Sequence, residues 1–133
     1  MTVILDTHVW VWWLLPDSPL PEKDRKALDR LASDQGICLS AISLWEVQML
    51  HNKKRVQLPI PFATWLRRAA SADMLTVLPL NADTVIAVDD LPAGFHGDPA
   101  DRMIVGTARA HNLPLATHDE VIKKSRLARI WKP

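Results

Sequence analysis

The chain has 133 residues, 48% hydrophobic and 23% charged, a composition typical of a folded domain rather than a disordered chain. Sixteen basic residues nearly balance fifteen acidic ones, so the net charge of +1 does not by itself indicate a nucleic-acid or membrane ligand. The single cysteine excludes an internal disulfide, and no apolar run is long enough to span a bilayer. We therefore expect one cytoplasmic domain over residues 1–133, without a membrane partner.

Short apolar runs alternate with helical patterns along the chain. Buried strands are predicted at residues 2–6, 37–39, 76–78 and 113–117, with a terminal edge strand at 128–131. Helices are predicted at residues 7–15, 22–31, 41–51, 62–72, from 81 or 83 to 90, 99–110, and from 119 onward. This alternation predicts an α/β fold with helices on both faces of a central parallel sheet of four to five strands.

Several carboxylates fall near what should be one edge of this sheet. Asp6 closes the first strand, and Asp119 follows the fourth. Asp98 before Pro99 is typical of a helix N-cap, with Asp101 in the first turn, so capping alone explains both acids. The helix they begin leads into the fourth strand, so its start should lie at the carboxyl edge, where parallel α/β sheets place their sites.

Glu46 is unusual because it lies on an apolar stripe of its helix, between Ile42 and Met49 on one side and Leu50 on the other. Burying an isolated carboxylate is costly, so the pattern predicts either an arginine ion pair or a metal ion. Clustered acids repel one another unless a cation compensates, and all-oxygen ligands suit Mg²⁺ or Mn²⁺. Ions held in this way catalyse phosphodiester hydrolysis by generating hydroxide and stabilising the leaving oxygen.

Four segments together resemble the motifs of PIN-domain ribonucleases, and particularly of the VapC-type toxins of bacterial toxin–antitoxin pairs. In chain order these segments are LDTHVW (5–10), SAISLWE (40–46), DPADR with TA (98–102 and 107–108) and ATHD (116–119). The resemblance implies a PIN-like three-layer α/β/α fold. It also implies an Mg²⁺- or Mn²⁺-dependent endoribonuclease that is dimeric and held inactive by a cognate antitoxin.

The resemblance also assigns roles by position. The family's catalytic metal-binding acids correspond to Asp6, Glu46, Asp101 and Asp119. Asp98 is either a further metal ligand or only a helix cap. Supporting polar side chains correspond to Thr7, Ser43 and Thr117. Gly106 stands where the family more often has alanine, a helix penalty of about 1 kcal/mol.

Basic residues form local clusters although the total charge is balanced. For a nuclease, the candidates for contact with the RNA backbone are Lys53, Lys54, Arg55, Arg102, Lys123 and Lys124. The same runs are also typical of a solvated face. The three tryptophans at 10, 12 and 13 likewise suit either the core or an exposed docking face.

Two rival functions use the same acids. A phosphatase with Asp6 as nucleophile would need a second acid close by, and Thr7 and His8 follow instead. An Mg²⁺-binding, phospho-accepting or binding-only α/β regulatory module would also use acids at this edge. Such a module does not need the helix-borne acid Glu46, so the sequence favours the nuclease.

Overall fold

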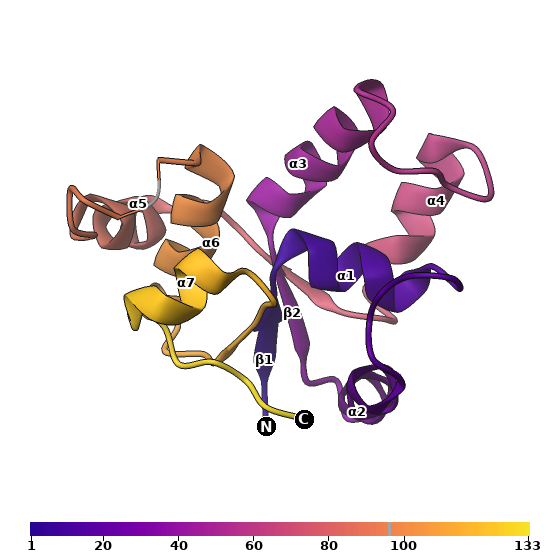
Figure 1. Ribbon diagram of the computed structural model, residues 1–133, viewed down its shortest axis with the longest axis horizontal. Coiled ribbons are helices and arrows are strands. Elements are labelled where there is room, and N and C mark those ends of the chain that lie inside the picture. The colour runs from indigo at the N-terminus through magenta and orange to yellow at the C-terminus, as the bar shows by residue number, and fades with distance from the viewer. Residues whose placement is uncertain (96) are drawn as a thin grey trace.

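The core of the protein is a parallel sheet of four strands in the order β3-β2-β1-β4 (Figure 1). The computed structural model describes residues 1–95 and 97–133. Its strands are β1 (Val3–Leu5), β2 (Ile37–Ser40), β3 (Thr76–Leu78) and β4 (Leu115–Ala116). In the central strand Ile4 is aligned with Cys38 on one side and with Leu115 on the other. The predicted parallel sheet is confirmed, with four strands.

Helices cover both faces of this sheet. In the described part of the chain they are α1 (Thr7–Leu14), α2 (Glu22–Ser33), α3 (Ala41–Asn52), α4 (Phe62–Ala69), α5 (Ala82–Asp89), α6 (Pro99–Ala110) and α7 (Glu120–Ser125). Figure 1 shows α1, α2 and α4 on one side of the strands and α5, α6 and α7 on the other. The predicted three-layer α/β/α arrangement is therefore confirmed. Among the described residues, no helix combines the length and apolar character that crossing a bilayer requires.

Alternate residues of β1 supply two separate cores. Val3 and Leu5 pack with the residues of α1, α2 and α4, whereas Ile4 packs with Ile104 of α6 and Ile122 of α7. All three strand residues are fully buried. Burial on both faces explains why the strand is a continuous apolar run rather than an alternating one.

Some predicted elements differ from the observed ones in length or type. The strand predicted at 113–117 covers only Leu115–Ala116, because Pro114 has no N–H group with which to extend the ladder. The edge strand predicted at 128–131 is wrong as a strand, although Ile130 forms an isolated parallel bridge with Leu115. The helix predicted at 62–72 ends at Ala69.

The three tryptophans of α1 have different environments. Trp10 is fully buried and donates its indole N–H to the Ala69 carbonyl at 3.0 Å. Trp13 is also buried and donates to Asp29 Oδ1 at 2.8 Å. Of the proposed aromatic docking face only Trp12, which is half-buried, remains partly open to solvent.

Gly106 allows α5 and α6 to pack closely. A Cβ atom at this position would press against the Val88 side chain and lie 3.3 Å from the Val88 backbone nitrogen. The residue therefore has a packing role, which helix propensity alone does not reveal.

Candidate functional site

A cavity of about 450 Å³, here called the acidic cavity, lies where the segments that follow β1 and β4 meet the start of α6. Its lining residues are Asp6, His8, Trp12, Glu46, Asp98, Asp101, His118 and Asp119. All five predicted acids therefore line one cavity. They converge because β1 lies between β2 and β4, so the segments that leave these three strands end at the same edge of the sheet.

Asp6 is the most buried acid of the cavity, with 4% of its surface exposed. Thr117 donates a hydrogen bond from Oγ1 to Asp6 Oδ2 at 2.7 Å, and the same hydroxyl accepts one from the Asp119 backbone N–H at 3.0 Å. Burial raises the pKa of Asp6, while the Thr117 hydrogen bond and His8 oppose the rise and the Asp119 charge adds to it. Thr117 thus positions two of the acids at once.

Glu46 lies in the second turn of α3 and has a buried Oε1 atom without a hydrogen-bond partner among the residues that the structure describes. The described residues show no ion pair to it, so the arginine alternative is wrong within that part of the chain. Burial raises the pKa of Glu46, the Thr7 hydroxyl lowers it, and the negative charge of Asp6 raises it further. A cation beside Oε1 would satisfy an otherwise costly buried oxygen.

The predicted supporting residues Thr7 and Ser43 lie beneath this region. Both are fully buried, and their hydroxyl oxygens are 2.8 Å apart. Ser43 lies one turn before Glu46 on α3, while Thr7 directly follows Asp6. The hydroxyl pair therefore links the start of α1 to α3 close to both acids.

Asp98 and Asp101 combine a capping role with a place in the cavity. Asp98 Oδ1 accepts a hydrogen bond from the Asp101 backbone N–H at 3.1 Å, which confirms the predicted N-cap of α6. Glu46, Asp98 and Asp101 each offer one carboxylate oxygen, and these three atoms lie within 4.8 Å of one another. Asp119 similarly caps α7 by accepting from the Ile122 N–H at 2.9 Å. Because a carboxylate has two oxygens, capping by one leaves the other for a cation.

The donor set fits a hard divalent cation. The five acids of the cavity offer carboxylate oxygens, whereas His8 and His118 offer two imidazoles. Carboxylate oxygens suit Mg²⁺ and Mn²⁺ rather than softer metals. The unpartnered Glu46 oxygen and the raised pKa of Asp6 both mark places where a positive charge would relieve an electrostatic cost.

Sequence reasoning did not identify three further cavity residues: His8, Trp12 and His118. The Trp12 ring neighbours both imidazoles, with ring centroids 5.8 Å from His8 and 6.2 Å from His118. His118 Nε2 is also 3.0 Å from Oδ2 of Asp24, a buried acid of α2 that is 94 residues away in sequence. The spacing of His8 and Trp12, one helical turn apart, was the only local signal for this group.

None of the predicted RNA-contacting residues lines the acidic cavity. Arg55 lines a neighbouring groove of about 550 Å³, and Lys123 lines a cavity of about 480 Å³ together with Lys23 and Lys132. Lys54 lines another cavity, and Arg102 donates to the Phe95 carbonyl at 3.2 Å. The two remaining candidates, Lys53 and Lys124, are exposed.

The sequence as a whole matches a known family. A model of the PIN domain covers residues 3–126. The chain belongs to the PIN domain family. This PIN domain is 36% identical to Ribonuclease VapC22 of Mycobacterium tuberculosis over 134 residues, covering 98% of each protein. The resemblance to VapC-type proteins that the four motifs indicated is thereby confirmed.

Solved structures share the fold of this PIN domain. DNA-bound VapBC from Salmonella typhimurium contains a chain with a TM-score of 0.76 and 22% identity, covering 98% of this chain and 97% of that one. FitAcB from Neisseria gonorrhoeae gives a TM-score of 0.73 at 22% identity, with the same coverage of 98% and 97%. At such low identity these likenesses establish the fold alone.

Proposed function

We propose that this PIN domain, over residues 1–133, is a metal-dependent endoribonuclease and the toxin of a toxin–antitoxin pair. The observation that carries the proposal is the convergence of five acids on one cavity, in which a buried oxygen of Glu46 has no hydrogen-bond partner within residues 1–95 and 97–133. The relative that is 36% identical is named a ribonuclease, which supports RNA as the substrate.

The residues that would hold Mg²⁺ or Mn²⁺ are Asp6, Glu46, Asp101 and Asp119, with Asp98 as a further ligand. When bound, such an ion supplies an activated water and stabilises charge on the leaving oxygen. The chain itself keeps the acids in place: Thr117 bonds to both Asp6 and Asp119. The N-terminus of α6 directs its partial positive charge toward this region, which favours phosphate as well as carboxylate.

The test is RNA cleavage by variants that remove one carboxylate charge each. We expect Asp6→Asn and Asp101→Asn to lose at least about 100-fold in Mg²⁺-dependent rate, since even residues behind metal ligands are worth 10- to 100-fold. Asp73→Asn is the matched control because Asp73 is exposed and does not line the cavity. Undiminished cleavage by either cavity variant would show that the acids do not form the reaction centre.

The regulatory alternative predicts a different reaction of the same cavity. A phospho-accepting module would take a phosphoryl group from acetyl phosphate onto an aspartate and would cleave no RNA. The unpartnered oxygen of Glu46 favours the nuclease, because a phospho-acceptor site does not require a helix-borne acid there. Mass spectrometry of the protein after incubation with acetyl phosphate and Mg²⁺ distinguishes the two functions.

We further propose a cognate antitoxin and a second copy of the chain as partners, with all of them in the cytoplasm. Solved structures of the same fold include VapBC from Rickettsia felis and from Salmonella typhimurium, which supports an antitoxin. Trp45, Val85 and Ile86 expose 51%, 48% and 58% of their surface, which supports a contact with another chain. Light scattering of the purified protein tests the homodimer, and a small reading frame directly upstream of this gene would identify the antitoxin candidate.

A further inference from the structure

Trp12 is the one tryptophan of α1 that is only partly buried, although it packs against the edge of the core. The indole N–H groups of Trp10 and Trp13 are donated to Ala69 and Asp29, whereas that of Trp12 has no partner among the described residues. Trp12 is half-buried, and its neighbours His8 and His118 are exposed. A large aromatic ring is therefore available at the wall of the acidic cavity.

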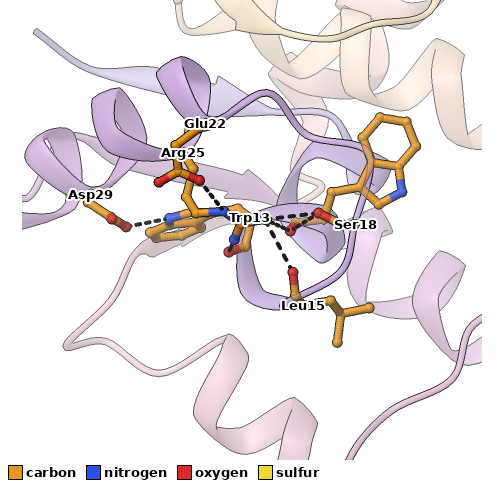
Figure 2. A network of polar contacts seen from close by, with 7 residues as sticks. Trp13, Leu15, Ser18, Glu22, Arg25 and Asp29 are labelled. Carbon is orange, nitrogen blue, oxygen red and sulfur yellow. Dashed lines mark hydrogen bonds and ion pairs between the residues drawn. The ribbon is translucent and has the colours of Figure 1, made fainter.

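The backbone of Trp12 is held firmly although its ring is open. Ser18 Oγ donates to the Trp12 carbonyl at 2.6 Å, and Arg25 donates to the same carbonyl at 3.2 Å. Arg25 also donates to the carbonyls of Trp13 and Leu15, so its guanidinium caps the last turn of α1 (Figure 2). This clamp fixes the backbone that carries the Trp12 ring, which lowers the entropic cost of ordering this segment when a ligand binds.

A second hollow, a groove, adjoins the acidic cavity at Trp12. His8 and Trp12 line both the cavity and the 550 Å³ groove. Val11, Leu15 and Leu58 make much of the groove wall apolar, while Arg55 and Gln57 supply polar groups. A volume of this size is typical of small-molecule pockets, and an apolar wall with few polar groups suits a flat heterocycle.

We propose that the groove at Trp12 is a nucleobase subsite that takes one unpaired base of the RNA next to the phosphate over the acidic cavity. The inference rests on the proposed nuclease function and adds a substrate class, RNA with an unpaired nucleotide at the cut. A paired base is stacked within its helix and cannot present its face to Trp12. The shared wall of His8 and Trp12 favours the RNA substrate over a protein segment, because the phosphate and the base of adjoining nucleotides can occupy two adjoining hollows.

The experiment compares two probes: an oligoribonucleotide of mixed sequence and an abasic ribose-phosphate chain of the same length. Binding is measured by fluorescence anisotropy in Mg²⁺ with the Asp101→Asn protein, so that cleavage does not interfere. We expect about 5- to 150-fold tighter binding of the chain that carries bases, the range that stacking of one base gives.

Two variants of Trp12 then test whether this residue causes the tighter binding of the base-bearing chain. Trp12→Leu should reduce the preference for the base-bearing chain at least about 5-fold, and Trp12→Phe should retain part of it. Trp45→Leu is the matched control, since Trp45 is 51% exposed but lines neither the acidic cavity nor the groove. An unchanged preference in Trp12→Leu would overturn the proposal, as would its absence in the protein with Trp12 intact.

The outcomes also separate this inference from the proposed nuclease function. If Asp6→Asn still cleaves RNA, the proposed reaction centre is wrong, while the binding preference still decides the subsite. If Trp12→Leu binds both probes like its parent but is no longer inhibited by the antitoxin, the groove belongs to a protein partner and the nucleobase subsite is refuted.

Discussion

Replacing Glu46 by glutamine should make the metal-free protein more stable. Glu46 Oε1 is buried without a partner, and the negative charges of Asp6 and Asp98 act on the same carboxylate. A glutamine amide still leaves a polar atom there, but it removes the negative charge; an unsatisfied buried polar group costs about 1–3 kcal/mol, and more when it is charged. Because Glu46 is only half-buried and water screens part of its charge, we expect the free energy of unfolding to rise by about 1–2 kcal/mol at pH 8. For a chain of this size that is a rise of about 3–8 °C in Tm.

The pH dependence has a definite sign. The pKa of Glu46 is raised above its ordinary value of 4.5, so the folded state holds this proton to higher pH than the unfolded state. Stability therefore falls as pH rises from 4.5 through the folded-state pKa, and the cost of the ionised carboxylate is fully present above it. Glu46→Gln cannot titrate, so its advantage over the unchanged protein should be small at pH 4.5 and largest at neutral pH and above.

In Mg²⁺ the unchanged protein should become more stable than Glu46→Gln. A ligand at 100 times its Kd stabilises the folded state by about 2.7 kcal/mol, and Glu46→Gln lacks one of the proposed ligands. The assay is urea unfolding followed by tryptophan fluorescence, with EDTA and with Mg²⁺. Glu22→Gln is the control, because that side chain is 69% exposed and outside the cavity. Equal stabilities at every pH, together with equal shifts in Mg²⁺, would refute the electrostatic reasoning.

Three further predictions concern packing, support of the acids and electrostatics. Gly106→Ala should lower the free energy of unfolding by about 1–3 kcal/mol through overpacking, despite the better helix propensity, and Val88→Ala should cost less in that background than alone. Thr117→Val should cost about 1.5–3 kcal/mol at neutral pH, measured by urea unfolding, because a buried carboxylate loses its hydrogen bond. Changing Lys23 and Lys132 to glutamine should reduce the slope of log Kd against log salt for single-stranded RNA by about 1.4. The same change at an exposed lysine outside the 480 Å³ cavity that Lys23 and Lys132 line should leave the slope unaltered.

The parts of the site that follow strands could be predicted from the sequence. Asp6 and Asp119 could be placed because parallel strands end at one edge, so an acid after each of two strands lies at that edge whatever the loop details. Glu46 could be found because its apolar neighbours fix which side of the helix faces inward. The N-cap pattern before Pro99 likewise located Asp98 and Asp101, since capping is a local interaction.

Contacts between distant segments could not be predicted in this way. The pattern of α2 indicates a charged solvent face, yet Asp24 is buried against His118 from the other end of the chain. The three tryptophans of α1 look alike in sequence, and only the packing of α2 and α4 separates Trp10 and Trp13 from Trp12. Clustering of basic residues showed where charge lies along the chain but not which cavity each side chain lines, because that depends on how the surface elements pack.

The central position of β1 has a consequence for the order in which the molecule can be built. The strand leaves the ribosome well before its partner β4, because β4 and the Thr117 hydroxyl that bonds to Asp6 lie 111 residues later. Contacts of such long sequence separation form late and slowly in folding. The nascent chain therefore carries an incomplete acidic cavity until β4 and Thr117 have left the ribosome, and the ribosome that makes the proposed nuclease is not exposed to the completed site before that point.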